Sequence, residues 1–321
     1  MDQPRTWKEA FLVNKGPKTP REIISLFIKG IFMGIANMIP GVSGGTMALI
    51  TGIYQDVLQA IRSFDLNTLR FLVRLEFKQA LATVHLRFLV VLICGIGLSI
   101  MSLAHFMNYV LNDHPVFTYS FFFGLILASI AVMALQTGKW VGSGGISFVL
   151  GAVGAYLFVG LIPVSTPDTW WFIFLAGAIT ICTMILPGLS GAFLLLIIGK
   201  YEYITSALKN PFDLQNFIIL SIFGLGCIVG IIAFSRVLTV LFNKFENTTM
   251  AALTGIMCGS LRKIWPWKEV LETKTIGSKV INLAEQNILP SQIDGNLALA
   301  VGLMIVGFIS VVVLERSAKQ R

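Results

Sequence analysis

The stretch Pro40-Gly41-Val42-Ser43-Gly44 recurs 147 residues later as Pro187-Gly188-Leu189-Ser190-Gly191, so that both copies have the pattern P-G-x-S-G. Each copy lies in the middle of an apolar run, and the residues around the two copies also correspond. The same offset aligns three further pairs: Gly30 with Gly177, Gly52 with Gly199, and Tyr54 with Tyr201. A motif that recurs together with its flanking residues indicates an internal repeat. We therefore expect two copies of one structural unit, each built around its own P-G-x-S-G turn.

The composition indicates a membrane protein. Of the 321 residues, 55% are hydrophobic and 12% are charged, whereas about 25% of residues are charged in a typical soluble domain. Several apolar segments approach about 20 residues, the length that crosses a bilayer as a helix. The formal net charge of +8 is typical of membrane proteins that use basic residues to set their topology and to contact lipid headgroups.

Signatures of metal binding, nucleic-acid binding and catalysis do not stand out in the sequence. The four cysteines form no C-x-x-C pair and the three histidines have no metal-ligand spacing, so no metal, cofactor or nucleic acid is expected. The zinc-protease pattern H-E-x-x-H does not occur. An intramembrane serine protease would need a base beside the motif serine and would have no use for a second copy. The chain is therefore not expected to be an enzyme.

Each motif separates two apolar segments, which we expect to be the arms of a hairpin. The arms cover about residues 23–39 and 46–61 around the first motif, and about 170–186 and 192–208 around the second. Each arm has about 16 residues, fewer than the about 20 that cross a hydrocarbon core of about 30 Å. Paired short segments interrupted by Pro and Gly are typical of broken helices. Arm length therefore favours a re-entrant hairpin over two full crossings.

The other apolar segments predict six membrane spans and one interfacial helix. Residues 66–85 combine apolar residues at helical spacing with several charges, which is typical of an amphipathic helix on the membrane surface. Residues 265–295 are polar enough to be an external loop. The predicted spans are residues 88–111, 116–135, 145–163, 214–241, 250–264 and 297–314.

We expect an all-α polytopic membrane protein, a single membrane domain over residues 1–321 built from two repeats. The first repeat covers residues 23–163, with the amphipathic helix inserted, and the second covers residues 170–314. Each repeat is a re-entrant hairpin followed by three transmembrane helices. Glycine patterns in these helices support the division: Gly95-Ile96-Gly97 resembles Gly224-Leu225-Gly226, and residues 124–129 resemble residues 255–260.

Three spans per repeat place the second repeat in the opposite orientation to the first, because a re-entrant hairpin adds no crossing. With the N-terminus in the cytoplasm, 17 of the 24 Lys and Arg residues fall on the cytoplasmic side and seven fall outside. Short cytoplasmic loops carry an excess of Lys and Arg. The charge distribution therefore predicts two inverted repeats, with both termini cytoplasmic.

The repeated motif is suited to binding an anion. Proline lacks a backbone donor and glycine permits a positive φ, so the helix breaks at the motif and a new helix begins after it. The start of a helix presents unpaired N–H groups and the positive end of the helix dipole, and Ser43 and Ser190 add hydroxyl groups there. Two inverted copies would bring two such helix starts together near the middle of the membrane, as in many secondary transporters. The alternative is a tight turn that serves packing alone.

Ionisable residues within or at the ends of apolar segments are candidates for supporting or coupling charge. Lys29, one residue before Gly30 in the first arm, is the first cation to test, although a lysine can also extend to the headgroups. Asp56, Arg62 and Glu202 are further candidates, including for proton or ion coupling. Lys200 and Glu202 flank Tyr201, and we expect both to be solvated at the external mouth.

The residues around the motifs also resemble a known family. KGIFMGIANMIPGVSGGTMALITGIY (residues 29–54) resembles the signature of the bacterial polyprenyl-phosphate (undecaprenyl-phosphate) transporters, and ILPGLSGAFLLLIIGKYEY (residues 185–203) is similar to the family's second copy. The resemblance covers essentially the whole chain and the order of its elements. It implies a substrate phosphate held by the motif residues Asn37, Pro40, Gly41, Ser43, Gly44, Gly45, Thr46, Pro187, Gly188, Ser190 and Gly191.

The resemblance implies a lipid translocase of the bacterial cytoplasmic (inner) membrane. Undecaprenyl phosphate would return from the outer to the inner leaflet by alternating access, for the synthesis of envelope polymers, with membrane phospholipids as the other partners. The two phosphate contacts would be unequal, because Met184 and Ala192-Phe193 replace Asn37 and Gly45-Thr46. One alternative is a transporter of a small soluble anion that uses the same helix starts. Another is a membrane protein whose motifs only pack. A lateral opening lined by apolar residues would favour the lipid over the small soluble anion.

Overall fold

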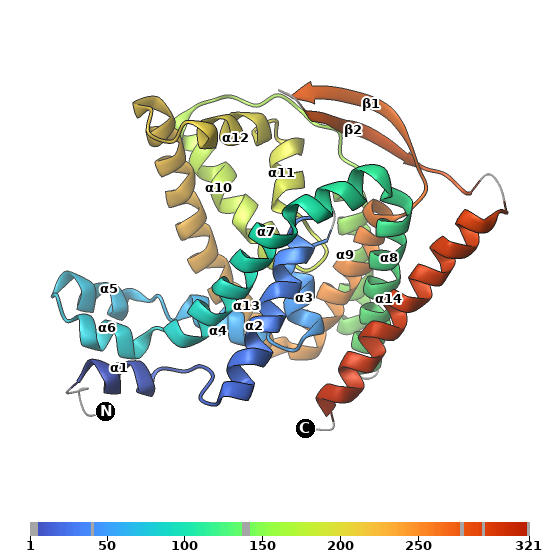
Figure 1. Cartoon of the computed structure of the whole chain (residues 1–321). Coiled ribbons are helices and arrows are strands. Elements are labelled where there is room, and N and C mark those ends of the chain that lie inside the picture. The colour runs from blue at the N-terminus through green and yellow to red at the C-terminus, as the bar shows by residue number, and fades with distance from the viewer. Residues whose placement is uncertain (1–5, 40–41, 137–141, 277–278, 291–292, 320–321) are drawn as a thin grey trace.

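The two P-G-x-S-G motifs lie at the tips of two helical hairpins (Figure 1). The computed structural model describes residues 6–39, 42–136, 142–276, 279–290 and 293–319, so Pro40 and Gly41 lie outside the described residues. The arms of the two hairpins are α2 (Pro20–Asn37) and α3 (Gly44–Ile50), and α10 (Trp170–Ile185) and α11 (Gly191–Ile197). The prediction that a new helix begins directly after each motif is confirmed.

The serine of each motif caps the helix that follows it. Ser43 Oγ accepts a hydrogen bond from Gly45 N at 3.1 Å, and Ser190 Oγ accepts one from Phe193 N at 3.4 Å. Such caps satisfy an N–H group that has no partner inside the helix and stabilise a helix by about 1 kcal/mol. The local sequence thus determines where α3 and α11 start.

The second arm of each hairpin is broken, because each of the predicted apolar segments 46–61 and 192–208 contains two helices instead of one continuous arm. The chain continues after α3 as α4 (Tyr54–Arg62) and after α11 as α12 (Tyr201–Lys209), with α11 and α12 bent by 113°. Gly52 and Gly199 end α3 and α11 at φ values of +73° and +64°. A left-handed residue stops a helix, and glycine adopts this conformation without steric cost.

Five of the six predicted spans lie in helices of membrane-spanning length, whereas the predicted span 145–163 corresponds to the shorter helix α9 (Ser143–Phe158). Within the described residues, four helices are long and apolar enough to cross a bilayer, and a fifth results if α11 and α12 count as one bent span. α13 holds both predicted spans 214–241 and 250–264, and a kink at Phe245, where the backbone is non-helical, separates them. The chain is therefore a multi-pass membrane protein. The four long helices are α7 (Leu86–Asp113), α8 (Pro115–Gln136), α13 (Leu214–Ile264) and α14 (Gly295–Lys319).

Close packing at glycines joins the first arm of each hairpin to the next long helix along the chain, α7 in the first half and α13 in the second. An added Cβ on Gly30 of α2 would lie 3.2 Å from Gly95 Cα of α7, and one on Gly177 of α10 would lie 2.2 Å from Phe223 O of α13. Gly226 makes the reciprocal approach to α10. Gly95 and Gly226 thus occupy equivalent places in the two halves of the chain. This pairing differs by two residues from the comparison of the sequences, which matched Gly95 with Gly224.

The remaining spans pack in two pairs, and each pair joins a helix from the first half of the chain to one from the second half. α8 packs against α14, and α9 (Ser143–Phe158) packs against the second part of α13. An added Cβ on Gly124 of α8 would lie 1.9 Å from Met304 O of α14. An added Cβ on Gly255 of α13 would lie 2.1 Å from Phe148 O of α9. Helices α8 and α13 therefore approach their partners at corresponding glycines.

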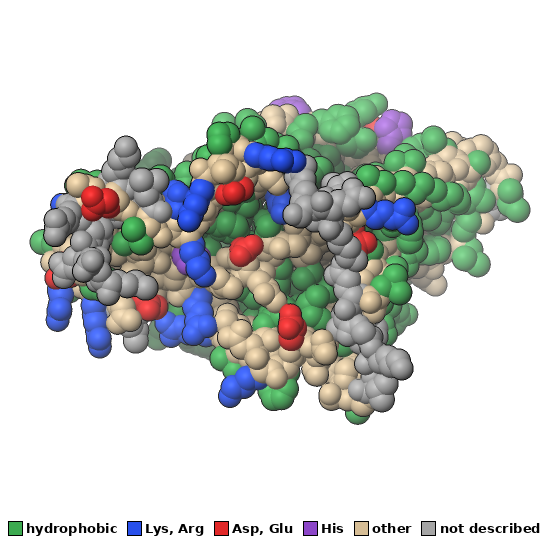
Figure 2. All heavy atoms as spheres, turned by 90° about the horizontal axis from the view of Figure 1, so that it is seen from below, with side chains coloured by type: hydrophobic (Ala, Val, Ile, Leu, Met, Phe, Trp, Pro, Cys, Tyr) green, Lys and Arg blue, Asp and Glu red, His purple; other side chains and the backbone are tan. Residues whose placement is uncertain are grey.

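Short helices cover one end of the molecule. Figure 1 shows α1 (Trp7–Val13), α5 (Leu66–Val73) and α6 (Phe77–Thr83) at the end that also holds the C-terminal part of α14. The prediction of one amphipathic helix over 66–85 is wrong, because Leu75 adopts φ +59° and Glu76 N donates to Phe71 O, which ends α5. Figure 2 views this end from below and shows many Lys and Arg side chains on it.

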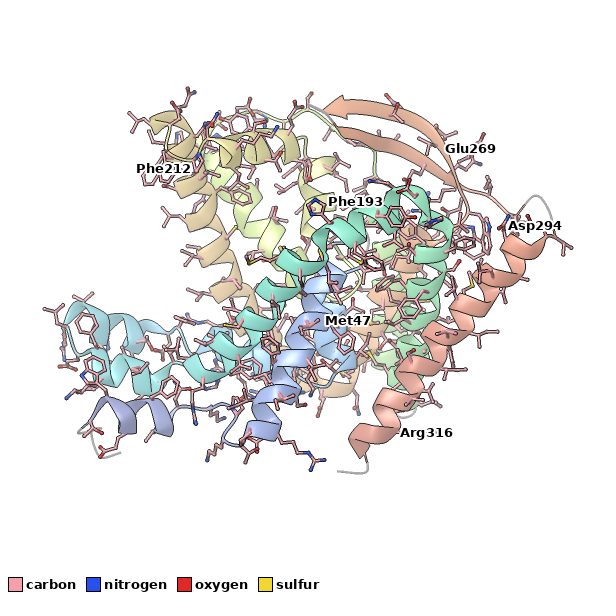
Figure 3. The ribbon with its side chains drawn as sticks, viewed as in Figure 1. Met47, Phe193, Phe212, Glu269, Asp294 and Arg316 are labelled. Carbon is pink, nitrogen blue, oxygen red and sulfur yellow. The ribbon has the colours of Figure 1, made fainter. Side chains whose placement is uncertain are left out.

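A β-hairpin lies at the opposite end, together with α12 (Figure 1). β1 (Lys268–Ile276) pairs with β2 (Lys279–Asn287) in an antiparallel sheet, so the prediction of an all-α chain is wrong in the polar segment 265–295. β-branched residues recur in both strands, which favours strand over helix. Figure 3 shows Phe212 and Glu269 toward this end and Arg316 toward the other.

Candidate functional site

The two hairpin tips contact each other through groups of both motifs. Ser43 Oγ donates a hydrogen bond to Met184 O at 3.1 Å, and Gly188 N donates one to Thr46 Oγ1 at 2.8 Å. Ser43 is 3% exposed and Thr46 is fully buried. Residues that are more than 140 positions apart in sequence thus meet in one buried contact. The sequence predicted that the motifs come together, and the structure brings these residues into direct contact.

The glycines of the first tip permit this close approach. An added Cβ on Gly45 would lie 2.4 Å from Ile185 O, which belongs to the other hairpin. Apolar side chains from both tips complete the contact, and Figure 3 labels Met47 among them. The buried apolar residues at the tips are Ile39, Val42, Met47, Ile185 and Leu189.

The N–H groups that were predicted to bind phosphate have protein partners in this structure. Gly44 N donates to Asn37 Oδ1 at 2.8 Å, and Gly45 N donates to Ser43 Oγ. The second tip differs at the equivalent place, where Gly191 lies against the side chain of Met184, a residue without a comparable acceptor. Asn37 and Met184 are both exposed at their tips. The predicted inequality of the two copies therefore has a structural counterpart.

Lys29 and Asp56 line a cavity of about 850 Å³ at the end of the molecule that carries α1. We call this space the arm cavity, because residues of the N-terminal arm form part of its wall. Its lining joins the arm, the first turns of α2, the start of α4 and the start of α7. The lining residues are Lys15, Gly16, Pro17, Thr19, Arg21, Glu22, Ser25, Leu26, Lys29, Ile53, Asp56, Gln59, His85 and Phe88.

The arm cavity is rich in cations. Lys15, Arg21 and Lys29 line it together with two carboxylates. Burial lowers the pKa of His85, and the charge of Lys15 lowers it further, while Asp56 acts in the opposite direction. The imidazole is therefore mainly neutral at pH 7, and the lysines and the arginine carry the positive charge. Such a lining attracts an anion such as a phosphate group.

Two residues that sequence reasoning missed hold the arm against α6 and α7. Asn14 Nδ2 donates to Leu81 O at 3.0 Å and also to Val84 O. The buried Arg87 guanidinium donates to the backbone carbonyl of Asn14. Because charged side chains are seldom buried without a partner, these bonds give Arg87 a structural role in shaping the arm cavity. Its position directly after the amphipathic segment was the signal available in the sequence.

Lys200 is buried, so the prediction that it is solvated is wrong. Its side chain is 2% exposed and pairs with Asp168, which is 61% exposed. Lys200 Nζ also donates to Thr166 O at 2.7 Å and lies 5.6 Å from the ring centres of Phe172 and Tyr203. Lys200 therefore anchors the start of α12 to the segment before α10. Arg62 and Glu202 are exposed, and neither lines the arm cavity.

Replacement of Lys200 by methionine is expected to lower the free energy of unfolding by about 1–3 kcal/mol, since the hydrogen bonds of a buried ammonium group are lost. Asp168→Asn is expected to cost less, because water screens its exposed carboxylate. Thermal unfolding of the purified protein in detergent measures both changes. Lys209→Met, at the exposed end of α12, is the control; equal melting temperatures for Lys200→Met and this control would contradict the anchoring role.

A second charged cavity, of about 650 Å³, lies at the end of the molecule that carries the β-hairpin. We call it the strand cavity, because β1 and β2 contribute to its wall. No described residue lines both this cavity and the arm cavity. The lining residues of the strand cavity are Phe123, Tyr156, Cys258, Gly259, Leu261, Arg262, Trp265, Leu271, Glu285, Gln286 and Asn287.

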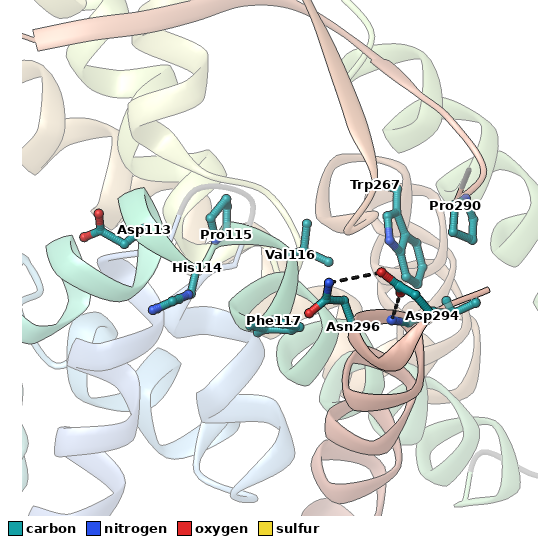
Figure 4. A pocket seen from close by; sticks show the side chains of 10 residues that line it. Asp113, His114, Pro115, Val116, Phe117, Trp267, Pro290, Asp294 and Asn296 are labelled. Carbon is teal, nitrogen blue, oxygen red and sulfur yellow. Dashed lines mark hydrogen bonds between the residues drawn. The ribbon is translucent and has the colours of Figure 1, made fainter. Parts of the chain in front are cut away.

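A smaller cavity of about 330 Å³ lies where α7 meets α8, beside the start of α14 (Figure 4). Asp294 accepts hydrogen bonds from Leu297 N at 2.9 Å and from Asn296 Nδ2 at 3.1 Å. These bonds cap α14, which accounts for the carboxylate in this place. His114 and Trp267 lie on the wall of the same cavity.

Comparison with known proteins places the chain among membrane transporters. Over 304 residues it is 38% identical to a polyprenyl-phosphate transporter of Vibrio cholerae serotype O1, covering 92% of this chain and 97% of that protein. A polyprenyl-phosphate transporter of Staphylococcus aureus is 28% identical over 254 residues, which cover 74% of this chain and 85% of that protein. No solved structure matches the chain significantly. The names of both relatives describe transporters and not enzymes.

The family match agrees with the resemblance noted in the sequence. Residues 33–281 match the VCA0040-like family, which is described as undecaprenyl phosphate translocase-like. The matched region contains both P-G-x-S-G motifs, the contact between the hairpin tips and the greater part of the strand cavity. The chain belongs to this undecaprenyl phosphate translocase-like family.

Proposed function

We propose that the protein carries polyprenyl phosphate from the outer to the inner leaflet of the bacterial cytoplasmic membrane, where the lipid serves again as a carrier for envelope polymers. The observation that carries this proposal is the contact of the two hairpin tips between two cation-lined cavities at opposite ends of the molecule. The family membership supports the substrate.

The helix contacts support two inverted repeats, residues 23–163 and 170–314. The pairing of α2 with α7 corresponds to that of α10 with the first part of α13. The pairing of α8 with α14 corresponds to that of the second part of α13 with α9. In Figure 1 the two hairpins also approach the middle of the molecule from opposite ends. We propose that the end with α1 and the many cations is cytoplasmic, in accordance with the positive-inside rule.

Transport would proceed by alternating access across the contact of the tips. In the present conformation, the buried apolar residues and the hydrogen bonds of Ser43 and Thr46 form the barrier. We infer that a phosphate group takes over the N–H and hydroxyl donors of the motifs, which now serve acceptors within the protein. The exchange replaces one set of hydrogen bonds by another, so it requires no buried donor to remain without a partner.

The cavities favour a lipid over a small soluble anion. The arm cavity combines its cations with Leu26, Ile53 and Phe88, and the strand cavity combines Arg262 with aromatic and aliphatic side chains. A phosphate that carries a hydrocarbon chain requires both kinds of contact, whereas a free inorganic anion requires only the polar one. Reconstituted protein that moves undecaprenyl phosphate but not inorganic phosphate would separate the two substrates.

The double variant Ser43→Ala with Ser190→Ala is expected to move undecaprenyl phosphate about tenfold to a hundredfold more slowly. A hydrogen bond to a charged group contributes about 1.5–3 kcal/mol, and each 1.4 kcal/mol corresponds to about a factor of ten. The measurement is the flipping of labelled undecaprenyl phosphate in liposomes that contain the purified protein.

Ser102→Ala with Ser310→Ala is the matched control for this double variant. Ser102 is exposed and Ser310 is half-buried, and each donates to a carbonyl of its own helix, Leu98 O and Val306 O. This control is expected to transport at the wild-type rate. A folded Ser43 and Ser190 double variant with the wild-type rate would remove the motif serines from the proposed site.

A further inference from the structure

We propose that the strand cavity is a second headgroup site, which binds the phosphomonoester of the lipid at the end of the molecule opposite the arm cavity. The inference rests on the proposed function, because it names where the same substrate is held on the other side of the hairpin tips. Its ligand class is a phosphomonoester attached to a hydrocarbon chain. Four observations carry it, and each concerns residues in or beside the cavity.

Arg262 supplies the cation that lines the cavity. Its Nη1 donates to Tyr156 O at 3.2 Å, and its guanidinium lies 4.5 Å from the centre of the Tyr156 ring. Gly160 leaves room for this group, since an added Cβ there would lie 2.4 Å from Arg262 Nη1. The guanidinium is thus held in a defined place, and its planar set of donors suits the oxygens of a phosphate.

Two lysines beside Arg262 add further positive charge. Glu285 lines the cavity, and its Oε2 lies 3.0 Å from Lys263 Nζ and 3.2 Å from Lys268 Nζ. Glu285 thus pairs with two lysines, and Arg262 lines the same cavity, so these four residues together carry an excess of two positive charges. The Glu285 carboxylate lies between two ammonium groups as a phosphate oxygen would, so an incoming phosphate can compete with it for the lysines.

Lys263 connects the charged residues at the strand cavity to the second hairpin. Lys263 Nζ lies 4.8 Å from the centre of the Phe193 ring, and Phe193 N donates to Ser190 Oγ in the motif. Figure 3 labels Phe193 between the strands and the middle of the molecule. Lys263 thus lies between the carboxylate of the cavity and the tip where the motif breaks the helix. A phosphate that binds here is adjacent to the proposed transport site.

The wall of the strand cavity also suits a hydrocarbon chain. Phe123, Leu261 and Trp265 line it from α8 and the end of α13, and Leu271 lines it from β1. Tyr156 is 51% exposed and Leu271 is 61% exposed. Apolar side chains therefore continue from the cavity to the outer surface of the protein. A prenyl chain can lie along them while its phosphate contacts Arg262.

Cys258 provides a probe, because it lines the cavity. With Cys94, Cys182 and Cys227 replaced by alanine, Cys258 is the one cysteine of the full chain. We expect a membrane-impermeant maleimide to alkylate it in proteoliposomes. Undecaprenyl phosphate at about ten times its Kd should slow this alkylation about tenfold, since about one site in ten stays free. Inorganic phosphate, which lacks the hydrocarbon contacts, should protect far less at the same concentration.

Arg262→Gln is expected to abolish the protection by lipid, and Gly160→Ala to weaken it while Arg262 stays in the chain. Lys209→Gln, an exposed cation at the same end of the molecule, should leave the protection unchanged. The proposal is overturned if Cys258 does not react in the lipid-free protein, if lipid does not slow its alkylation, or if both Arg262→Gln and Gly160→Ala retain full protection. Equal protection by inorganic phosphate would assign the cavity to a soluble anion instead.

The two proposals fail separately. Lipid protection of Cys258 in a protein that moves no undecaprenyl phosphate would support the headgroup site and contradict the transport function. Wild-type flipping without any protection of Cys258 would contradict the headgroup site alone.

Discussion

A Gly45→Ala variant is expected to lose most of its transport of undecaprenyl phosphate and to unfold at a lower temperature. The added methyl group would lie 2.4 Å from Ile185 O and 3.2 Å from Met184 O, which are backbone atoms of the opposite hairpin. Neither carbonyl can turn away as a side chain would, so the two tips must separate. Overpacking of this kind costs about 1–3 kcal/mol, and the separated tips cannot form the barrier that alternating access requires.

Flipping assays in liposomes and thermal unfolding in detergent measure the two effects of Gly45→Ala. Gly97→Ala is the control, because an added Cβ at Gly97 meets no described atom within 4 Å. This control should retain the wild-type rate and melting temperature. If Gly45→Ala transports at the wild-type rate and melts with the control, the contact of the tips is not part of the transport cycle.

The second large effect is expected for Lys29→Gln, which should reduce transport about tenfold or more with little change in melting temperature. Lys29 is half-buried in the wall of the arm cavity. Two unit charges about 4 Å apart attract each other by about 4 kcal/mol at an effective dielectric constant of about 20. Glutamine retains a polar side chain, which is one atom shorter than that of lysine, and removes this attraction for the phosphate.

Lys29→Arg should keep most of the activity, since it keeps the charge. Lys244→Gln is the matched control, because Lys244 is an exposed cation in the second half of the chain and does not line the arm cavity. The measurement is the rate of lipid flipping as a function of lipid content. Equal rates for Lys29→Gln and Lys244→Gln would assign Lys29 to the headgroup region rather than to the site.

The candidate site was predictable in part. Local chemistry explains the motifs, because Ser43 and Ser190 cap the helices that begin after each break. The repetition of the motif also indicated that the two tips work together. The partners of the tip residues were not predictable, because Ser43 and Thr46 bond to backbone groups more than 140 residues away. No local pattern encodes such a pairing.

The errors at the hairpins and the amphipathic segment have one physical origin. Gly52, Leu75 and Gly199 each adopt a positive φ and end a short helix. Apolar periodicity continues across all three positions, so a reading by periodicity joins the helices on either side. The glycines were visible signals for a helix end, whereas Leu75 was not, because its conformation costs energy that the surrounding structure must offset.

By itself, the sequence determined that this protein crosses the membrane repeatedly, that it contains two copies of a broken hairpin, and where the helices α3 and α11 begin. These features depend on composition, on backbone conformation and on caps within a few residues. Only the tertiary structure decided that the tips bond to each other, that Lys200 is buried beside Asp168, and that Arg262 and Glu285 share a cavity. These features depend on contacts between distant segments, whose geometry follows from the packing of whole helices.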